Sequence, residues 1–260
     1  MVIGKSRAAL IISNPRRMVL ADQADHRQPR QEAMLARKRP KKARNLLPTP
    51  ACVYCGRPAT TRDHVPPKAI FVELHLSDLV TVPACEDCNN RASQSDEGFR
   101  NIMGMRASEK SPNSLALWQK TFRSLRRRRH ELQALWESLQ EVPIFTESGL
   151  YLGAATEGAF DAEAHDRTIE RITRGFYFYH FGQSLPVDSP VEAYPIRDGA
   201  HWQKAVAPLL MRMQIGNIGG PAIFEYALAR EEDEPDSSLW VYRFYARHVA
   251  VAETGLLARG

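Results

Sequence analysis

Four cysteines in this sequence form two Cys-x-x-Cys pairs, and an Asp-His dipeptide lies between the pairs. The pairs are Cys52 with Cys55 and Cys85 with Cys88. Four thiolates at this spacing can bind one tetrahedral zinc ion. Asp63, His64 and Asn89, which directly follows the last cysteine, are not needed for that zinc. Carboxylate and amide oxygens suit a harder divalent ion, and histidine can act as a general base. The sequence therefore predicts a structural zinc and, beside it, a second divalent ion where chemistry takes place.

The elements that must position these residues lie between and after the two cysteine pairs. The gap between Cys55 and Cys85 is 29 residues, which is longer than the roughly 15–20 residues of a simple zinc ribbon. An insert that carries the Asp-His dipeptide fills this gap. Within it, the pattern predicts a short helix over 69–74 and a strand over 79–83, and a helix can begin at Glu86.

The order of these elements and three short motifs resemble the HNH endonuclease family, whose core is a ββα-metal finger. The resemblance covers about residues 50–105, roughly a fifth of the chain. The motifs are Cys52-Val53-Tyr54-Cys55-Gly56, then Asp63-His64-Val65-Pro66 with Lys68, then Val82-Pro83-Ala84-Cys85-Glu86-Asp87-Cys88-Asn89. A double Cys-x-x-Cys occurs in many binding modules, so the Asp-His-x-Pro motif and the asparagine make the resemblance specific.

The resemblance implies a role for each residue of the module. His64 matches the general base that activates water, and Asp63 and Asn89 match the ligands of a catalytic Mg²⁺ or Mn²⁺ ion. The four cysteines match the ligands of the structural zinc. The implied activity is metal-dependent hydrolysis of phosphodiester bonds in nucleic acid, with DNA as the expected substrate.

Two positions depart from the family pattern. Ala92 stands where many members have lysine, three residues after the helix ligand. Asp78, Val80 and Thr81 occupy the region where members often have an asparagine that orients the base.

Asp96 lies seven residues after Asn89 and is either a third ligand or, as we favour, the N-cap of a following helix over 97–105.

Positive charge is concentrated in two segments that are candidates for contact with nucleic acid. The chain has 260 residues and a net charge of +5. Residues 1–48 alone contain 12 Lys and Arg against 3 Asp and Glu, so we expect a basic, disordered arm. A second run comprises Arg126, Arg127, Arg128 and Arg129. This run is either a solvated helix face or, with Lys68, a surface that follows the phosphates.

The fold class expected from the whole pattern is α+β. We predict a basic arm over 1–48, the zinc and nuclease module over 49–107, a helical connector over 108–141 and an α+β domain of unknown role over 142–260. The apolar spacing over 114–140 indicates one long helix or two with a bend. In the last range we expect a helix over 160–172, a strand over 174–181 and a helix over 200–213. A turn over 216–221 and a hairpin of strands over 223–228 and 239–245 complete the prediction, with 248–252 extending that sheet.

The location and the oligomeric state are less constrained by the sequence. No secretory signal and no run of about 18 apolar residues occurs, so we expect a soluble cytoplasmic protein with no membrane contact. The sequence does not indicate an oligomeric state. Residues 1–33 lack a clear period, and Met34 could begin a shorter product.

Two other functions are compatible with the same motifs. The departures at Ala92 and near Thr81 give weight to a non-catalytic zinc module that binds nucleic acid. A nuclease effector of a defence or toxin system is the other alternative, with the C-terminal domain as a sensor or immunity contact.

Overall fold

The computed structural model describes residues 9–12, 50–72, 79–106, 111–146, 148–159, 161–196, 213–220 and 223–255. It confirms a mixed α+β fold. The helices are α1 (Glu86–Met105), α2 (Pro112–Arg127), α3 (Arg129–Ser138), α4 (Ala162–Phe181) and the short 3-10 helix η2 (Lys68–Ile70). The strands are β1 (Ala9–Ile12), β2 (Thr61–Val65), β3 (Val80–Ala84), β4 (Gln140–Phe145), β5 (Tyr151–Ala159), β6 (Val191–Pro195), β7 (Gln214–Ile218), β8 (Phe224–Arg230), β9 (Ser238–Phe244) and β10 (His248–Thr254).

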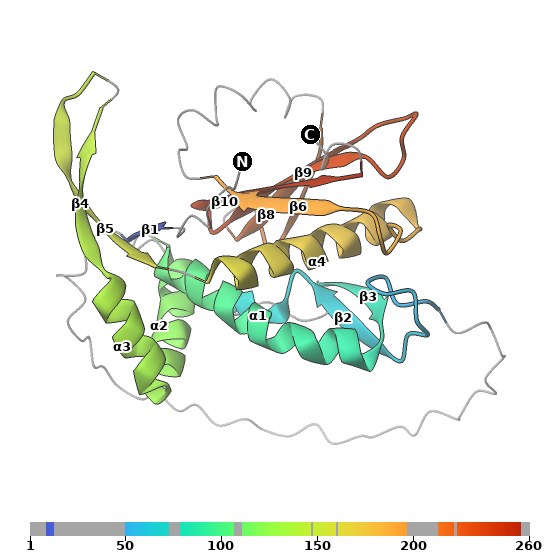
Figure 1. The fold of residues 1–260 in the computed structure, drawn as a ribbon, viewed down its shortest axis with the longest axis horizontal. Coiled ribbons are helices and arrows are strands. Elements are labelled where there is room, and N and C mark those ends of the chain that lie inside the picture. The colour runs from blue at the N-terminus through green and yellow to red at the C-terminus, as the bar shows by residue number, and fades with distance from the viewer. Residues whose placement is uncertain are drawn as a thin grey trace, which may run out of the picture.

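The described strands form antiparallel sheets of different size. The largest has the order β6-β10-β9-β8-β7, a second has the order β1-β5-β4, and β2 pairs with β3 alone. Figure 1 shows α4 between the five-stranded sheet and a layer made by α1 and the β2–β3 hairpin. The helix α4 is therefore the element that joins the sheet to the cysteine module.

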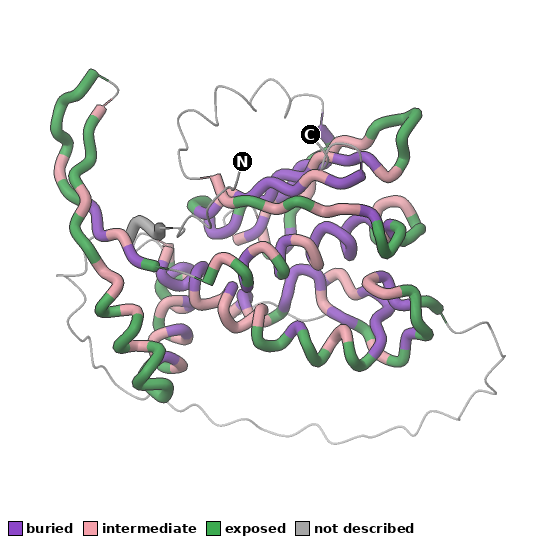
Figure 2. The backbone as a smooth tube through the Cα atoms, in the orientation of Figure 1, coloured by how far each residue is buried: buried purple, intermediate pink, exposed green. Residues whose placement is uncertain are grey.

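One buried cluster runs through these layers (Figure 2). It includes Val53 and Val82 from the cysteine module, and Trp240 and Ala252 from the C-terminal segment. Phe176 of α4 belongs to this cluster and contacts several aromatic rings of the sheet, with its ring centroid 4.6 Å from that of Tyr226. The sequence ranges expected to form the module and the C-terminal domain therefore share a hydrophobic core.

Several elements expected from the sequence are confirmed. The segment 114–140 contains two helices with a break at Arg128. The break before this segment, over 111–114, also fits the sequence pattern, since Ser111 is the N-cap of α2 and its side chain accepts from Ser114 N at 3.5 Å. Strands β8 and β9 form the expected hairpin, and β10 extends that sheet. The strand over 79–83 is present as β3.

The expected strand over 174–181 is wrong, because these residues continue helix α4. Asp161 caps the start of this helix, and Gly182, with φ of 69°, ends it. Phe176 and Tyr177 are both fully buried although they are consecutive. A helix enclosed between two layers can bury neighbouring residues, whereas a strand with one buried face alternates. The aromatic residues suggested β structure, but their strand preference reflects packing more than backbone.

Smaller differences concern turns and short helices. The expected turn over 216–221 begins later, since β7 continues to Ile218 and the positive φ angles occur at Gly219 and Gly220. The helix expected over 69–74 is limited to η2 in the described part. Most of the expected helix over 200–213 lies outside the described residues. So does the expected basic arm over 1–48, except for β1, which pairs with β5.

The packing of α4 on β2 yields a prediction about stability. Gly175 of α4 faces Val65 of β2 so closely that an added Cβ would lie 2.6 Å from a Val65 methyl group. We expect Gly175→Ala to lower the free energy of unfolding by about 1–3 kcal/mol, the usual cost of overpacking. Chemical denaturation measures this, with Ser93→Ala on the exposed side of α1 as the control. Equal stability of Gly175→Ala and the control would contradict this packing.

Candidate metal and catalytic site

The four cysteines converge on one point. Their Sγ atoms all lie within 4.8 Å of one another, and Cys55 Sγ lies 3.6 Å from Cys85 Sγ. Zinc–thiolate bonds of about 2.3 Å in a tetrahedron place the sulfurs about 3.8 Å apart. All four thiols are free rather than joined in disulfides. The structure thus confirms a cysteine group that could bind a metal such as zinc.

Local backbone structure builds this group. Gly56 adopts φ of 72°, and its N–H donates to Cys52 O at 2.9 Å, so the chain turns tightly between the first two cysteines. Cys85 is the N-cap of α1, and its Sγ accepts from Cys88 N at 3.5 Å. Val53 N donates to Pro83 O at 3.1 Å, which ties the first cysteine loop to β3. The group therefore joins this loop to the start of α1.

Asp63 lies on β2 and points into the protein, with 6% of its surface exposed. Its Oδ2 accepts from the hydroxyl of Tyr54 at 2.7 Å and also from the guanidinium of Arg171 on α4. Within the described part of the chain, no hydrogen bond to Oδ1 is found. One oxygen of the carboxylate is thus fixed by the protein, and the other is left available for a ligand.

Asn89 lies in the first turns of α1, beside the peptide unit that precedes Asp63. Its Nδ2 donates to Thr61 Oγ1 at 3.3 Å and to Arg62 O at 3.5 Å. A backbone carbonyl can only accept, so the NH₂ group must face β2. The amide oxygen then faces away from the strand. Asn89 therefore offers an oxygen that can serve as a ligand.

His64 follows Asp63 on β2 and is half-buried. Successive side chains of a strand point to opposite faces, so His64 lies on the face of the hairpin opposite Asp63. Among the described strands, β2 pairs with β3 alone, so the other edge of β2 has no strand partner in this part of the chain.

Of the three residues in the region expected to orient His64, the structure describes Val80 and Thr81. Thr81 is the partner of His64 in the β2–β3 ladder. Its hydroxyl accepts from Arg62 Nε at 2.9 Å, so it is bonded to a neighbour of the histidine and not to the histidine itself. Val80 lies opposite Val65, and Asp78 lies outside the described residues.

The favoured interpretation of Asp96 as the N-cap of a separate helix is wrong. Helix α1 runs unbroken through it from Glu86 to Met105. Arg171 Nη1 lies 2.6 Å from Asp96 Oδ1, and burial raises the pKa of this carboxyl group to about 6. No local pattern in the sequence indicated Arg171, since it belongs to α4 and lies 108 positions after Asp63.

Of the basic residues proposed to contact nucleic acid, Arg128 forms ion pairs with other side chains. Lys68 is exposed on η2, and the arginine run spans the bend between α2 and α3. Arg128 pairs with Glu97 and with Glu131, the latter at 3.0 Å. These ion pairs link α1 to α3 through Arg128. The other three arginines of the run are exposed. Glu97 lies eight residues beyond Asn89, about 12 Å along the helix.

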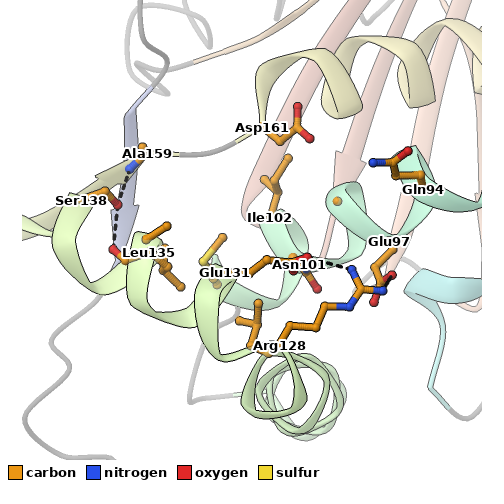
Figure 3. Close-up of a pocket in the computed structure, with 14 residues that line it drawn as sticks. Gln94, Glu97, Asn101, Ile102, Arg128, Glu131, Leu135, Ser138, Ala159 and Asp161 are labelled. Carbon is orange, nitrogen blue, oxygen red and sulfur yellow. Dashed lines mark hydrogen bonds and ion pairs between the residues drawn. The ribbon is translucent and has the colours of Figure 1, made fainter.

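A cavity of about 420 Å³ lies between α1 and α3 (Figure 3). Glu97, Arg128 and Asp161 contribute polar groups to its wall, and Ile102 and Leu135 contribute apolar surface. Of the proposed site residues, Arg128 alone lines it. The cavity is thus separate from the cysteine group and from Asp63.

His248, for which the sequence analysis predicted no role, lies in a buried chain of hydrogen bonds. Its Nδ1 is 3.0 Å from the Arg106 guanidinium, so this nitrogen must accept. Its Nε2 then donates to His165 Nε2 at 2.9 Å, and His165 Nδ1 lies 2.7 Å from Asp166 Oδ1. Burial, with the nearby His165 and Arg106, lowers the pKa of His248 well below its usual value.

This shift predicts that acid destabilises the protein. As the pH falls below about 6.5, the unfolded chain takes up a proton that folded His248 does not. The free energy of unfolding should therefore fall by up to about 1.4 kcal/mol per pH unit until the folded pKa is reached. Urea unfolding between pH 7.5 and 5.5 measures this slope. His248→Gln should flatten it, and the exposed His130→Gln should not. Equal slopes in both variants would contradict the assignment.

No family model matches the sequence, and neither curated proteins nor solved structures gave a match. Among the helices of the described residues, none is long and apolar enough to cross a membrane. The arguments about function therefore depend on the residues themselves.

Proposed function

We propose that the protein is a metal-dependent endonuclease of the HNH type, with His64 as the general base. The observation that supports this best is that two neighbouring elements, β2 with Asp63 and α1 with Asn89, each carry a side-chain oxygen without a hydrogen bond from the described residues. Asp63 Oδ1 accepts no hydrogen bond from the described residues, and Asn89 is oriented by β2 so that its amide oxygen is available. Both are hard ligands of the type that Mg²⁺ and Mn²⁺ prefer.

The proposed chemistry divides between the two sides of β2. A divalent ion bound by Asp63 and Asn89 would stabilise charge on the scissile phosphate and the leaving oxygen. His64, on the other face, would take the proton of the attacking water at the strand edge. A zinc ion on the four cysteines would hold the first loop and the start of α1 in place, and so fix Asn89 relative to β2.

The proposed substrate is DNA, gripped through its phosphates. Lys68 and the arginines Arg126, Arg127 and Arg129 are exposed basic groups that could make such contacts. Contacts of this kind position the backbone and carry little sequence information. We therefore expect binding that weakens steeply as the salt concentration rises.

Incubation of the purified protein with plasmid, single-stranded DNA and RNA tests this proposal. Each substrate is tested with Mg²⁺, with Mn²⁺ and with EDTA. We expect nicked or linear plasmid with either ion and none with EDTA. No cleavage of any substrate, together with a gel shift of the plasmid, would instead support a binding module.

One observation favours that second function, a non-catalytic zinc module. Asp63 is buried and bonded to Tyr54 and Arg171, as a structural carboxylate would be. Under this alternative His64→Ala leaves binding unchanged and there is no cleavage to lose. The two functions thus differ in the wild-type cleavage assay as well as in the variant.

A further inference from the structure

Arg171 connects helix α4 to both elements of the proposed catalytic site. One nitrogen of its guanidinium contacts Asp63 on β2, and the other lies 2.6 Å from Asp96 on α1. The guanidinium also lies over the ring of Tyr54, with Cζ 5.6 Å from the ring centroid. The arginine therefore bridges the strand that carries the base and the helix that carries Asn89.

The surroundings of Arg171 hold its side chain in one place. Only 15% of the side chain is exposed. Burial opposes its charge, but Asp63 and Asp96 outweigh this and raise the pKa of Arg171. The arginine is therefore charged, and removing it would leave two buried carboxylates without their cation, which is a costly arrangement.

The two carboxylate oxygens of Asp63 differ in their hydrogen bonds, and this difference determines which oxygen a ligand can reach. Tyr54 and Arg171 both donate to Oδ2, so this oxygen already has two strong partners. A carboxylate fixed through one oxygen cannot rotate freely, and its other oxygen keeps a defined direction. Metal sites commonly use outer partners of this kind to orient a ligating side chain.

We propose that Arg171 is a positioning residue for Asp63, holding Oδ2 so that Oδ1 is presented to the divalent ion. This inference rests on the proposed function, because it requires that ion. It assigns the C-terminal segment a direct part in the site: α4 supplies the group that orients the ligand. The cysteine module alone would then lack a complete site.

A different role for the same contacts makes the opposite prediction. If Arg171 merely occupies the place of a cation between Asp63 and Asp96, its removal frees both carboxylates. The affinity for a divalent ion would then rise. Under the positioning role the affinity falls, since Asp63 loses the partner that fixes its orientation.

Mn²⁺ binding to the full-length, zinc-loaded protein separates these roles, with free Mn²⁺ measured by electron paramagnetic resonance. The variants are Arg171→Gln, Arg171→Lys and Tyr54→Phe, with Asp63→Ala as the reference for loss of the ligand. Arg167→Gln is the matched control, because Arg167 lies one turn earlier on α4 and pairs on the surface with Glu163. Circular dichroism and zinc content show which variants stay folded.

We expect Arg171→Gln to weaken Mn²⁺ binding by roughly 10- to 100-fold, as loss of an outer partner does elsewhere. Arg171→Lys should also bind weakly, because an ammonium group cannot bridge both carboxylates as a planar guanidinium does. Tyr54→Phe removes one donor to the same oxygen and little volume, so it provides the test if Arg171→Gln fails to fold. Cleavage at saturating Mn²⁺ should recover in part, while the Mn²⁺ concentration for half-maximal rate increases.

The Mn²⁺ affinities distinguish a failure of the positioning role from a failure of the proposed metal site. If wild-type protein binds Mn²⁺, Asp63→Ala abolishes that binding and Arg171→Gln binds equally well or better, the positioning role is overturned while the proposed metal site stands. If wild-type and Asp63→Ala bind Mn²⁺ equally, the metal site itself is wrong and the inference is overturned with it.

Discussion

His64→Ala is expected to lower the rate of plasmid cleavage by at least about 100-fold, the usual contribution of a general base. The side chain lies half-buried on β2, so its truncation leaves no cavity in the hydrophobic core. The cysteine group and the contacts of Asp63 do not involve His64. The variant should therefore keep its zinc, its thermal stability and its affinity for DNA while it loses cleavage.

His130→Ala provides the matched control, because His130 is exposed on α3. It removes the same side chain at a distance from the hairpin, and we expect cleavage at the wild-type rate. Both variants are assayed beside the wild-type protein under single-turnover conditions. A His64→Ala protein that cleaves within twofold of wild type would exclude this residue as the base.

Cys85→Ser is expected to release the zinc and cause the largest loss of stability. Cys85 is buried and is the N-cap of α1, so it connects the metal site to the helix that bears Asn89. Structural zinc in small modules contributes about 10–16 kcal/mol of apparent binding free energy to folding. Serine fills nearly the same space but is a poor zinc ligand, so the first cysteine loop should separate from α1.

Metal analysis and thermal unfolding measure the two effects of this substitution. We expect the wild-type chain to bind about one zinc, consistent with four cysteine ligands, and the variant to bind much less and unfold at a lower temperature. Asn90→Ala, an exposed position on the same helix, should alter neither quantity. Zinc content that Cys85→Ser does not lower would refute the cysteine site.

The parts of the structure that the sequence predicted depend on local signals. The cysteine spacing, the glycine after Cys55 and the proline before the second pair restrict the chain to a few conformations. The hairpin of β8 and β9 likewise follows from two short apolar and aromatic segments joined by the acidic loop over 230–238. Each of these signals lies within a few residues of the feature that it predicts.

The missed parts depend on contacts between distant segments. The segment from Arg174 to Phe181 looked like a strand because it is aromatic, and only the enclosure of α4 between two layers explains why it is helical. Arg171 lies more than 100 positions from Asp63, and no local pattern links them. The prediction for Asp96 was wrong for the same reason, because its partner Arg171 comes from α4.

The central claim is that two different metals serve one module, and cleavage after selective removal of the weaker ion tests it most directly. Zinc-loaded protein is treated briefly with EDTA and desalted, and its zinc content is checked before plasmid is added. The account predicts no cleavage until Mg²⁺ or Mn²⁺ is restored, and full cleavage afterwards, with about one zinc per chain throughout. Cleavage that continues without added Mg²⁺ or Mn²⁺, or that none of these ions restores to a fully zinc-loaded protein, would contradict it.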